Sequence, residues 1–387
     1  MKDYDVIVIG GGMVGLAFAL ELSQRNNCSI AIVEPGNSNP NIDKNFHSRV
    51  SAITSTSKNY LGSLNVWDDI SRKRPFIATK VWDQNSHGHL NFHAQDESLE
   101  QLGFIVENDL IQSVLFGAID QSKIDFISAK LSNLLKTKNG YELLLGNKDK
   151  LTCKLLVGAD GSRSKVREIC EIEISENDYE QKAIIANIAS EKSFEYTTWQ
   201  RFLSESIVAL LPLSDKKASI VWSCENKLAE KLITLEDAEF EKALAEAVEY
   251  RFGVFSLQNK RQSFPLIERS SKSYVLPNLA LIGDAAHNIH PLAGQGVNLG
   301  FADCRELNLQ FSTYPDKTLG DYSVLRSYAR ARRLDNELMA KTMTGLNWIY
   351  KENIEPVRWL RGIGMNIIDD TPMLKSFFQR HALGKPN

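Results

Sequence analysis

The sequence has few cysteines, and they follow no pattern of a metal site or a disulfide framework. Five cysteines are spread over 387 residues, with no Cys-x-x-Cys pair. They are Cys28, Cys153, Cys170, Cys224 and Cys304. Scattered cysteines are typical of proteins in a reducing compartment. The pattern therefore argues against a zinc centre and favours a cytoplasmic location.

The sequence also lacks a strong excess of charge and a long apolar run. The formal net charge is −3, from 45 basic and 48 acidic residues, so we expect no general affinity for nucleic acids. No stretch of about 18 uninterrupted apolar residues occurs, so we expect no transmembrane helix. Asp3 and Asp5 stand where a signal peptide carries positive charge, so we expect no cleaved leader.

Residues 6–34 carry the most specific motif of the chain. A short apolar run leads into Gly-Gly-Gly-Met-Val-Gly (residues 10–15), an apolar helical segment follows, and a second apolar run ends on Glu34. In a dinucleotide-binding fold the first glycine of Gly-x-Gly-x-x-Gly makes a tight turn. The second lets the backbone approach a pyrophosphate, and the third lets the helix pack on the strand. Glu34, about 20 residues further on, suits the ribose hydroxyls.

Two later stretches repeat the pattern of an apolar strand that ends in a short acidic turn. Residues 154–161 end in Asp160-Gly161, and residues 278–284 end in Gly283-Asp284. The carboxyl ends of strands in a nucleotide-binding sheet face the ligand crevice. A Pro- and Gly-rich loop follows the second turn and opens a helix that begins near Gly294. Such a helix start suits a flat polar ring that gains negative charge.

Basic residues and histidines elsewhere offer weaker signals. Arg49 follows a polar loop and suits a phosphate group; the alternative is a solvated surface side chain. His87, His89 and His93 alternate along an expected strand and so share one face. Only Asp96 lies nearby in the sequence to complete a ligand set, so we expect no metal site.

The remaining pattern predicts an inserted sheet and a helical C-terminus. Residues 183–224 alternate strand-like runs with polar turns, which predicts a mostly antiparallel sheet. Residues 322–350 predict a helix with Leu334 facing inward and Arg332 among its polar positions. The apolar, basic stretches that follow predict docking against the core or a partner subunit. The alternative is a helix that lies on a membrane surface.

The three motifs, in this order, resemble those of the single-component FAD-dependent aromatic hydroxylases, the para-hydroxybenzoate hydroxylase class, over nearly the whole chain. Within that class, four stretches resemble the ubiquinone-biosynthesis hydroxylases: residues 49–53, 209–213, 290–300 and 330–333. The resemblance implies an α/β fold: a Rossmann-like FAD-binding domain with an inserted, mostly antiparallel β-sheet substrate domain and a helical C-terminus. We expect the FAD-binding domain at residues 1–75, 101–178 and 265–387, and the substrate domain at residues 76–100 and 179–264.

The resemblance also implies the residues of the cofactor site. The expected set is Gly10, Gly12, Val14, Gly15, Glu34, Arg49, Gln112, Asp160, Gly283, Asp284, Pro291, Gly296, Val297 and Asn298. Within it, Glu34 belongs to the adenosine half of FAD, Gln112 lies beside the flavin, and Asp284 binds cofactor hydroxyls. Pro291 and Gly296 belong to the loop that lines the flavin ring. No residue is assigned as a general base.

The implied function is an FAD-dependent monooxygenase that hydroxylates the ring of a polyprenylated phenol in ubiquinone biosynthesis through a flavin hydroperoxide. The resemblance implies that it uses O2 and NAD(P)H, with another electron donor as the alternative. We expect no separate NAD(P)H domain, because no second Gly-x-Gly-x-x-Gly follows a strand. Ser206-Ile207 stand where family members commonly carry Gly-Pro, which leaves the ring substrate open.

Two alternatives remain open from the sequence: hydroxylation of a small soluble phenol, and a non-catalytic flavoprotein scaffold in a biosynthetic complex. A flavin halogenase is disfavoured because the motif Trp-x-Trp-x-Ile-Pro is absent. The expected partners are a hydrophobic phenolic substrate and O2. A homo-oligomer, a biosynthetic complex and a peripheral contact with the inner membrane surface through the C-terminal helices are further alternatives.

Overall fold

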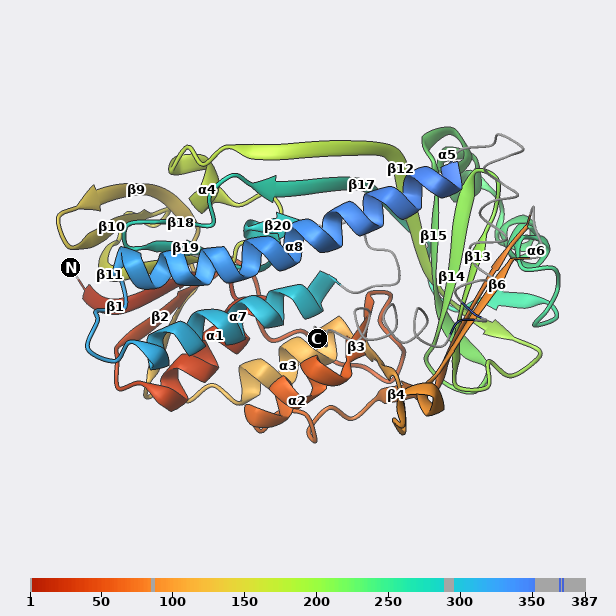
Figure 1. Ribbon diagram of the computed structural model, residues 1–387, viewed down its shortest axis with the longest axis horizontal. Helices are drawn as coiled ribbons and strands as arrows, with labels where there is room; N and C mark the ends of the chain where they lie inside the picture. The colour runs from red at the N-terminus through yellow and green to blue at the C-terminus, as the bar shows by residue number, and fades with distance from the viewer. Residues whose placement is uncertain (1, 85–87, 289–295, 352–368, 370, 372–387) are drawn as a thin grey trace.

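The computed structural model describes residues 2–84, 88–288, 296–351, 369 and 371 (Figure 1). The short helical stretches expected after residue 351 lie outside these residues. Two large sheets form the two ends of the molecule, and the helices α7 (Gly296–Thr313) and α8 (Tyr322–Lys351) run along one side. The predicted Rossmann-like fold with an inserted, mostly antiparallel sheet is confirmed.

An eight-stranded sheet forms the end that contains the N-terminus. Its order is β18-β19-β11-β1-β2-β8, and β10 and β9 continue from β11. β1, β2, β8, β11 and β19 are parallel to one another. The strands are β1 (Lys2–Ile9), β2 (Ile30–Val33), β8 (Ile124–Ile127), β9 (Leu131–Thr137), β10 (Gly140–Leu145), β11 (Lys150–Gly158), β18 (Val275–Leu276) and β19 (Leu279–Leu281).

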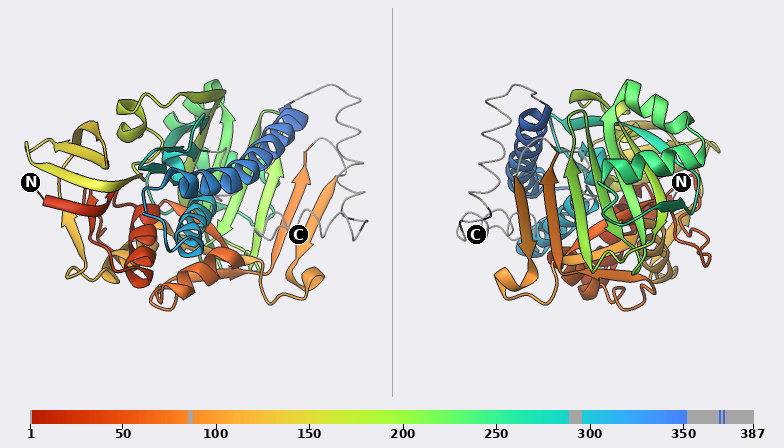
Figure 2. Two further views of the ribbon diagram at one scale, coloured as in Figure 1. Left: turned by 60° about the vertical axis from the view of Figure 1, so that its left-hand side comes forward. Right: turned by 90° about the vertical axis from the view of Figure 1, so that its right-hand side faces the viewer.

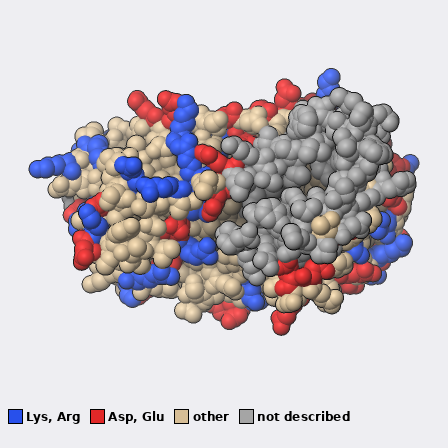
Figure 3. Space-filling model, viewed as in Figure 1, with Lys and Arg blue, Asp and Glu red and all other residues tan. Residues whose placement is uncertain are grey.

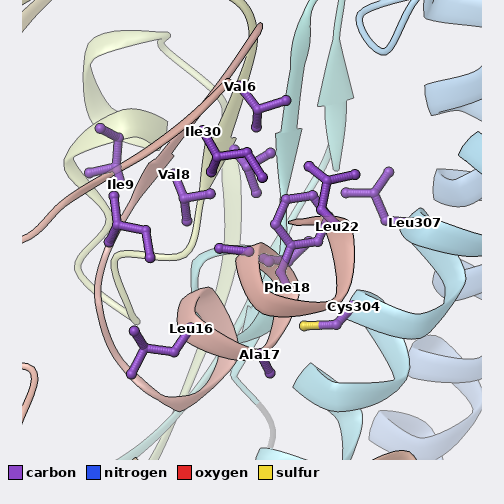
Figure 4. Packing of buried hydrophobic residues seen from close by; sticks show 14 of the residues in the cluster. Val6, Val8, Ile9, Leu16, Ala17, Phe18, Leu22, Ile30, Cys304 and Leu307 are labelled. Atoms are coloured by element: carbon purple, nitrogen blue, oxygen red, sulfur yellow. The ribbon is translucent and has the colours of Figure 1, made fainter. Parts of the chain in front are cut away.

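Helix α1 (Met13–Arg25) packs between this sheet and α7, which explains the apolar sequence of its first three turns. In Figure 4 the side chains of Phe18 and Leu22 lie among the residues of the sheet, and Cys304 and Leu307 of α7 lie against α1. All four side chains are buried. The central strands β1 and β2 read as nearly continuous apolar runs because both of their faces are covered.

A nine-stranded sheet forms the other end, with the order β20-β17-β12-β15-β14-β13-β5-β6 and β16 beside β12. Only β13 and β5 run parallel. Helices α5 (Asn226–Thr234) and α6 (Asp237–Ala247) cover its outer face (Figure 2, right). The strands are β5 (Ala78–Asp83), β6 (His89–His93), β12 (Ile174–Ser190), β13 (Thr197–Phe202), β14 (Ser206–Pro212), β15 (Lys217–Glu225), β16 (Phe255–Leu257), β17 (Gln262–Ser271) and β20 (His287–Asn288).

A small third sheet and short helices join the two ends. The sheet has the order β3-β7-β4, with β3 (Val50–Thr54), β4 (Lys73–Phe76) and β7 (Gly103–Glu107). The remaining elements are α2 (Ser55–Ser63), α3 (Asn108–Gly117), α4 (Lys165–Ile169), α5 (Asn226–Thr234), α6 (Asp237–Ala247) and the 3-10 turns η1 (Ala94–Glu97) and η2 (Gly283–Ala285).

Helix α8 corrects the prediction of its inward face. Leu334 is 72% exposed, whereas Arg332 is buried at 6% exposure. The buried residues follow a spacing of three or four along Leu325, Tyr328, Arg332 and Asn336, which is one face of a helix. Arg332 lies on that face because a buried carboxylate of α7 stands opposite to it.

Two findings concern only the described residues. Among them, no helix combines the length and the apolar character needed to cross a membrane, and no group of three or more His, Cys, Asp or Glu side chains is arranged to hold a metal ion. His89 and His93 lie on β6, while His87 lies outside the described part of the chain.

Candidate functional site

Four parallel strands of the eight-stranded sheet end side by side. Ile9 of β1 pairs with both Val33 of β2 and Gly158 of β11, and Gly158 pairs with Leu281 of β19. Each motif found in the sequence begins within three residues of one of these strand ends. Because ligands of such sheets bind beyond the carboxyl ends of the strands, the fold brings the motifs to one candidate site.

The glycine turn after β1 combines two packed positions with an open one. Gly10 has φ +111°, and a Cβ there would lie 2.3 Å from the carbonyl oxygen of Ala159. A Cβ at Gly15 would lie 2.0 Å from the carbonyl oxygen of Gly10. A Cβ at Gly12 would meet no heavy atom within 4 Å. Gly12 immediately precedes α1, so the open position stands at a helix N-terminus, where an anionic group is favoured.

Glu34 and Gln112 frame this turn. The Glu34 carboxylate accepts hydrogen bonds from the amides of Gly11 at 2.8 Å and Gly36 at 2.7 Å. The Gln112 side chain reaches from α3 and donates to the carbonyl oxygens of Gly11 at 3.4 Å and Ser38 at 3.2 Å. Both backbone bonds fix the Glu34 carboxylate beside the turn, and a carboxylate has further lone pairs for a ligand's hydroxyl groups.

Asp160 uses one carboxylate oxygen and leaves the other unpaired. Its Oδ2 accepts from the amides of Lys165 at 2.6 Å and Val166 at 3.1 Å, at the start of α4. Its Oδ1 is buried and has no hydrogen-bond partner among the described residues. Burial raises the pKa of Asp160. An unpaired buried acceptor is costly, so this oxygen suits a donor group of a ligand.

Asp284 opens toward solvent from the turn after β19. Gly283 has φ +59°, and a Cβ there would lie 3.1 Å from Val14, whose side chain thus packs against the turn. The Asp284 carboxylate accepts from Asn288 Nδ2 at 3.3 Å. Surrounding protein desolvates it and raises its pKa, although the charges of His287 and Arg49 oppose this shift. Arg49 is exposed.

The start of α7 closes the described part of the site. Asn298 accepts from the amide of Thr54 at 3.1 Å and donates to the carbonyl oxygen of Ala52 at 2.8 Å, which ties α7 to β3. Gly296 is exposed, with open space where a Cβ would stand, and Val297 is half-buried. Pro291 lies outside the described residues.

Two buried cations near the site were missed by sequence reasoning. Arg167 donates to the carbonyl oxygens of Ser162 at 2.7 Å and Ala285 at 3.0 Å and so joins the second and third motifs. Arg332 pairs with the fully buried Asp303. Their positions in the sequence could have indicated that both residues are buried. Asp303 and Arg332 both fall in the inward stripes of their helices, where a charge without a partner is rarely tolerated.

These observations fit a dinucleotide cofactor. The open space at Gly12 admits a pyrophosphate, Glu34 offers acceptors for hydroxyl groups, and the unpaired Oδ1 of Asp160 is a free acceptor among the described residues. A bound FAD supplies electron transfer and oxygen activation, whereas the protein supplies binding, orientation and exclusion of water.

Comparisons with known proteins support the same cofactor. The family described as FAD binding domain matches residues 3–341. The 3-demethoxyubiquinol 3-hydroxylase of Escherichia coli is 32% identical, over 98% of this chain and 98% of that protein. The ubiquinone biosynthesis monooxygenase COQ6 of Xenopus tropicalis is 32% identical, over 94% of this chain and 89% of that protein.

Solved structures share the fold at lower identity. PqsL of Pseudomonas aeruginosa, a probable FAD-dependent monooxygenase, has a TM-score of 0.78 at 17% identity, over 94% of this chain and all of that chain. The p-nitrophenol 4-monooxygenase PnpA of Pseudomonas putida has a TM-score of 0.78 at 15% identity, over the whole of both chains. The chain therefore belongs to the FAD-dependent monooxygenase family that contains the ubiquinone-biosynthesis hydroxylases.

Proposed function

We propose that this protein hydroxylates the aromatic ring of a polyprenylated phenol in ubiquinone biosynthesis, with FAD as cofactor, O2 as co-substrate and NAD(P)H as electron donor. The observation that carries the proposal is the 32% identity to the E. coli 3-demethoxyubiquinol 3-hydroxylase along nearly the full length of both chains. The candidate cofactor site of this chain is consistent with that chemistry, because its strand-end acceptors and glycine turn suit FAD.

An apolar sheet face supports a hydrophobic substrate. On β14, Val208 and Leu210 belong to the buried cluster under α5 and α6. Successive side chains of a strand point to opposite faces, so Ile207, Ala209 and Leu211 face the other way. Leu211 packs in a cluster with Ala52 of β3, whose carbonyl oxygen accepts from Asn298 at the start of α7. This apolar face is therefore turned toward the candidate cofactor site.

We assign FAD to the strand-end site in the order set by the fold. The glycine turn and Glu34 take the adenosine half, and Asp284 takes hydroxyl groups of the cofactor. The flavin ring lies at the start of α7, near Gly296 and Val297, and the assignment includes Pro291. The amide groups at a helix N-terminus favour negative charge, so the start of α7 stabilises charge that develops on a bound ring.

The domain division is part of this proposal. We assign the FAD-binding domain to residues 1–75, 101–178 and 265–387 and the substrate domain to residues 76–100 and 179–264. The nine-stranded sheet supports the division, although β12 begins at Ile174 and β17 ends at Ser271, so these strands extend into the FAD-binding domain. The extension gives the substrate sheet a direct connection to the cofactor site.

We also propose a peripheral membrane contact, because a polyprenylated substrate resides in a membrane. The outer face of α8 exposes Arg326, Arg330 and Arg333 together with Tyr322 and Leu334. Figure 3 shows basic side chains on this side of the molecule with acidic side chains among them, and Arg333 pairs with Glu337 at 2.6 Å. A basic face with exposed apolar side chains suits anionic lipid headgroups. A biosynthetic complex and a homo-oligomer are alternative occupants of this face.

The test compares two phenols with the same ring, one with a prenyl tail and one without, under 18O2 with NADPH. We expect a hydroxylated product that carries one labelled oxygen. The kcat/KM of the tailed phenol should be at least about tenfold higher than that of the phenol without a tail, because each buried CH2 adds about 0.8 kcal/mol of binding. Equal rates would favour a small soluble substrate. Flavin without product from either phenol would favour the scaffold alternative.

A further inference from the structure

A buried carboxylate lies behind the turn that carries Asp284. Asp303 of α7 is fully buried. Its Oδ1 accepts from Arg332 Nε at 2.7 Å, and its Oδ2 accepts from the amide of Gly283 at 2.8 Å and lies 2.6 Å from His287 Nε2. Both oxygens are therefore occupied by groups from three other elements. Burial alone would raise the pKa of Asp303, but the charges of His287 and Arg332 outweigh it and lower the pKa.

Helix α8 supplies the cation that pairs with Asp303 and also a hydrogen bond to the end of β19. Arg332 is also held by Asn336, whose Oδ1 accepts from its guanidinium at 2.9 Å. One turn earlier, the Tyr328 hydroxyl donates to the carbonyl oxygen of Leu281 at 2.8 Å. Leu281 is the last residue of β19. The helix thus holds both the end of β19 and, through Asp303, the turn that follows it.

The direction of Asp284 depends on this turn. Gly283 adopts φ +59° and has no side chain to hold its conformation. Asp284 itself has a hydrogen bond to Asn288 at 3.3 Å, which is long for a charged acceptor. The amide of Ala286 donates to the carbonyl oxygen of Gly283 at 2.8 Å and closes the turn from within. The short bond from the Gly283 amide to Asp303 is the side-chain restraint on the backbone that aims the Asp284 carboxylate.

We propose that Asp303 is a positioning residue for the cofactor: it holds the Gly283 amide so that Asp284 faces FAD, and Arg332 makes this alignment depend on α8. The inference rests on the proposed assignment of Asp284 to the cofactor. It adds a residue that touches no cofactor atom but sets the geometry of one that does. Positions of this kind act through preorganisation, because a fixed acceptor loses no orientational freedom on binding.

The experiment measures FAD affinity by fluorescence quenching and the Tm of the apoprotein in the same variants. In Asp303→Asn we expect FAD affinity to fall about tenfold or more, the size of a lost charge-assisted hydrogen bond. In this variant Arg332 keeps Asp335, at 2.9 Å, as a carboxylate partner but loses the buried one. The double variant with Arg332→Gln removes this partly paired cation, so its apoprotein Tm should recover toward the wild type while its FAD affinity stays low. Arg333→Gln, an exposed neighbour on α8, is the matched control and should change neither value.

The outcomes separate the inference from the proposed site. Wild-type affinity in Asp303→Asn, or recovery of both affinity and Tm in the double variant, would overturn the positioning role. If Asp284→Ala binds FAD like the wild type, the site assignment itself fails. If both Asp303 variants fail to fold, hydrogen exchange of the backbone amides in the wild-type apoprotein tests whether the Gly283 amide is restrained. Exchange at Gly283 as slow as in β19 supports the restraint, and exchange at a loop-like rate refutes it.

Discussion

At the scale of single residues, two aspartates near the same turn have opposite surroundings. Asp284 has few hydrogen bonds and a raised pKa, because desolvation outweighs the charges of His287 and Arg49. Asp303 is deeper but has a lowered pKa, because its interactions with His287 and Arg332 outweigh its burial. A carboxylate that remains incompletely paired at a strand end is suited to bind a ligand, whereas a fully paired one is suited to hold structure.

Asp284→Ala should lose FAD without unfolding the protein. The substitution removes an acceptor for cofactor hydroxyls, but among the described residues it breaks one long hydrogen bond, to Asn288. We expect a purified variant with little or no bound flavin, read from its visible absorbance, and an apoprotein Tm close to that of the wild type. Asp316→Ala, at an exposed aspartate, is the matched control. Full flavin content in the Asp284 variant would refute the assignment.

The stability of the apoprotein should depend on Asp303 in a pH range set by its lowered pKa. Since the folded pKa lies below that of the unfolded chain, about 3.9, the contribution is present above pH 4 and is lost as the pH falls through the folded value. Asp303→Asn should therefore lower Tm at pH 7, because it breaks a buried ion pair and leaves Arg332 with the exposed Asp335 as its carboxylate partner. The expected cost is at most about 3–5 kcal/mol. The Tm difference from the wild type should shrink below about pH 4. A difference that stays constant with pH would contradict this.

At the scale of elements, the sequence predicted those features that depend on a single strand or turn. The strands β1, β2, β11 and β19 are apolar because both faces of the sheet are covered, and the motifs follow directly at their ends. The positions of Asp303 and Arg332 in their helices could have marked each as buried, but their pairing was not predictable, because it depends on which faces of α7 and α8 meet. For the same reason, the sequence pattern wrongly predicted that Leu334 faces inward and that Arg332 lies on the polar face. Arg332 is charged, so its position on the buried face of α8 was not recognised.

The glycine turn offers a sharp test of which positions serve folding and which serve the cofactor. Gly12→Ala should leave the apoprotein Tm nearly unchanged, since a Cβ there meets no protein atom, but should weaken FAD binding by filling the open space. Gly15→Ala should destabilise the fold, because its Cβ would collide with the Gly10 carbonyl oxygen.

Gly62→Ala in α2 is the control for these glycine variants, because its Cβ also meets no atom within 4 Å. It should leave FAD affinity unchanged and raise stability by about 0.5–1 kcal/mol, the helix preference of alanine over glycine. Thermal unfolding of the three apoproteins and FAD titration give both readouts. Normal FAD affinity in Gly12→Ala would mean that the pyrophosphate lies elsewhere.

At the scale of the whole molecule, the substrate sheet and the cofactor turn are joined by hydrogen bonds. β20 pairs with β17, and the amide of Ser271 donates to the carbonyl oxygen of Ala286 at 2.8 Å. β17 lies beside the long strand β12, which reaches from one end of the molecule toward the other (Figure 1). The substrate sheet and the residues that follow Asp284 are therefore connected through paired backbone.

The basic face of α8 should bind anionic vesicles. We expect sedimentation with phosphatidylserine-containing vesicles but not with neutral ones, and weaker binding at high salt, because each surface arginine contributes about 1 kcal/mol. Arg326→Glu with Arg330→Glu should abolish sedimentation. Lys227→Glu with Lys231→Glu, exposed basic positions on α5, is the matched control. Equal binding by both double variants would place the contact elsewhere.

The measurement that tests the central claim most directly is the anaerobic reduction of the bound flavin by NADPH, followed in the visible spectrum with and without a prenylphenol. A substrate-dependent hydroxylase predicts flavin bands in the purified protein that bleach faster when the prenylphenol is present. A spectrum without flavin bands even after FAD is added would contradict the cofactor assignment. Flavin that stays oxidised in both samples would contradict the proposed hydroxylation with NADPH as donor.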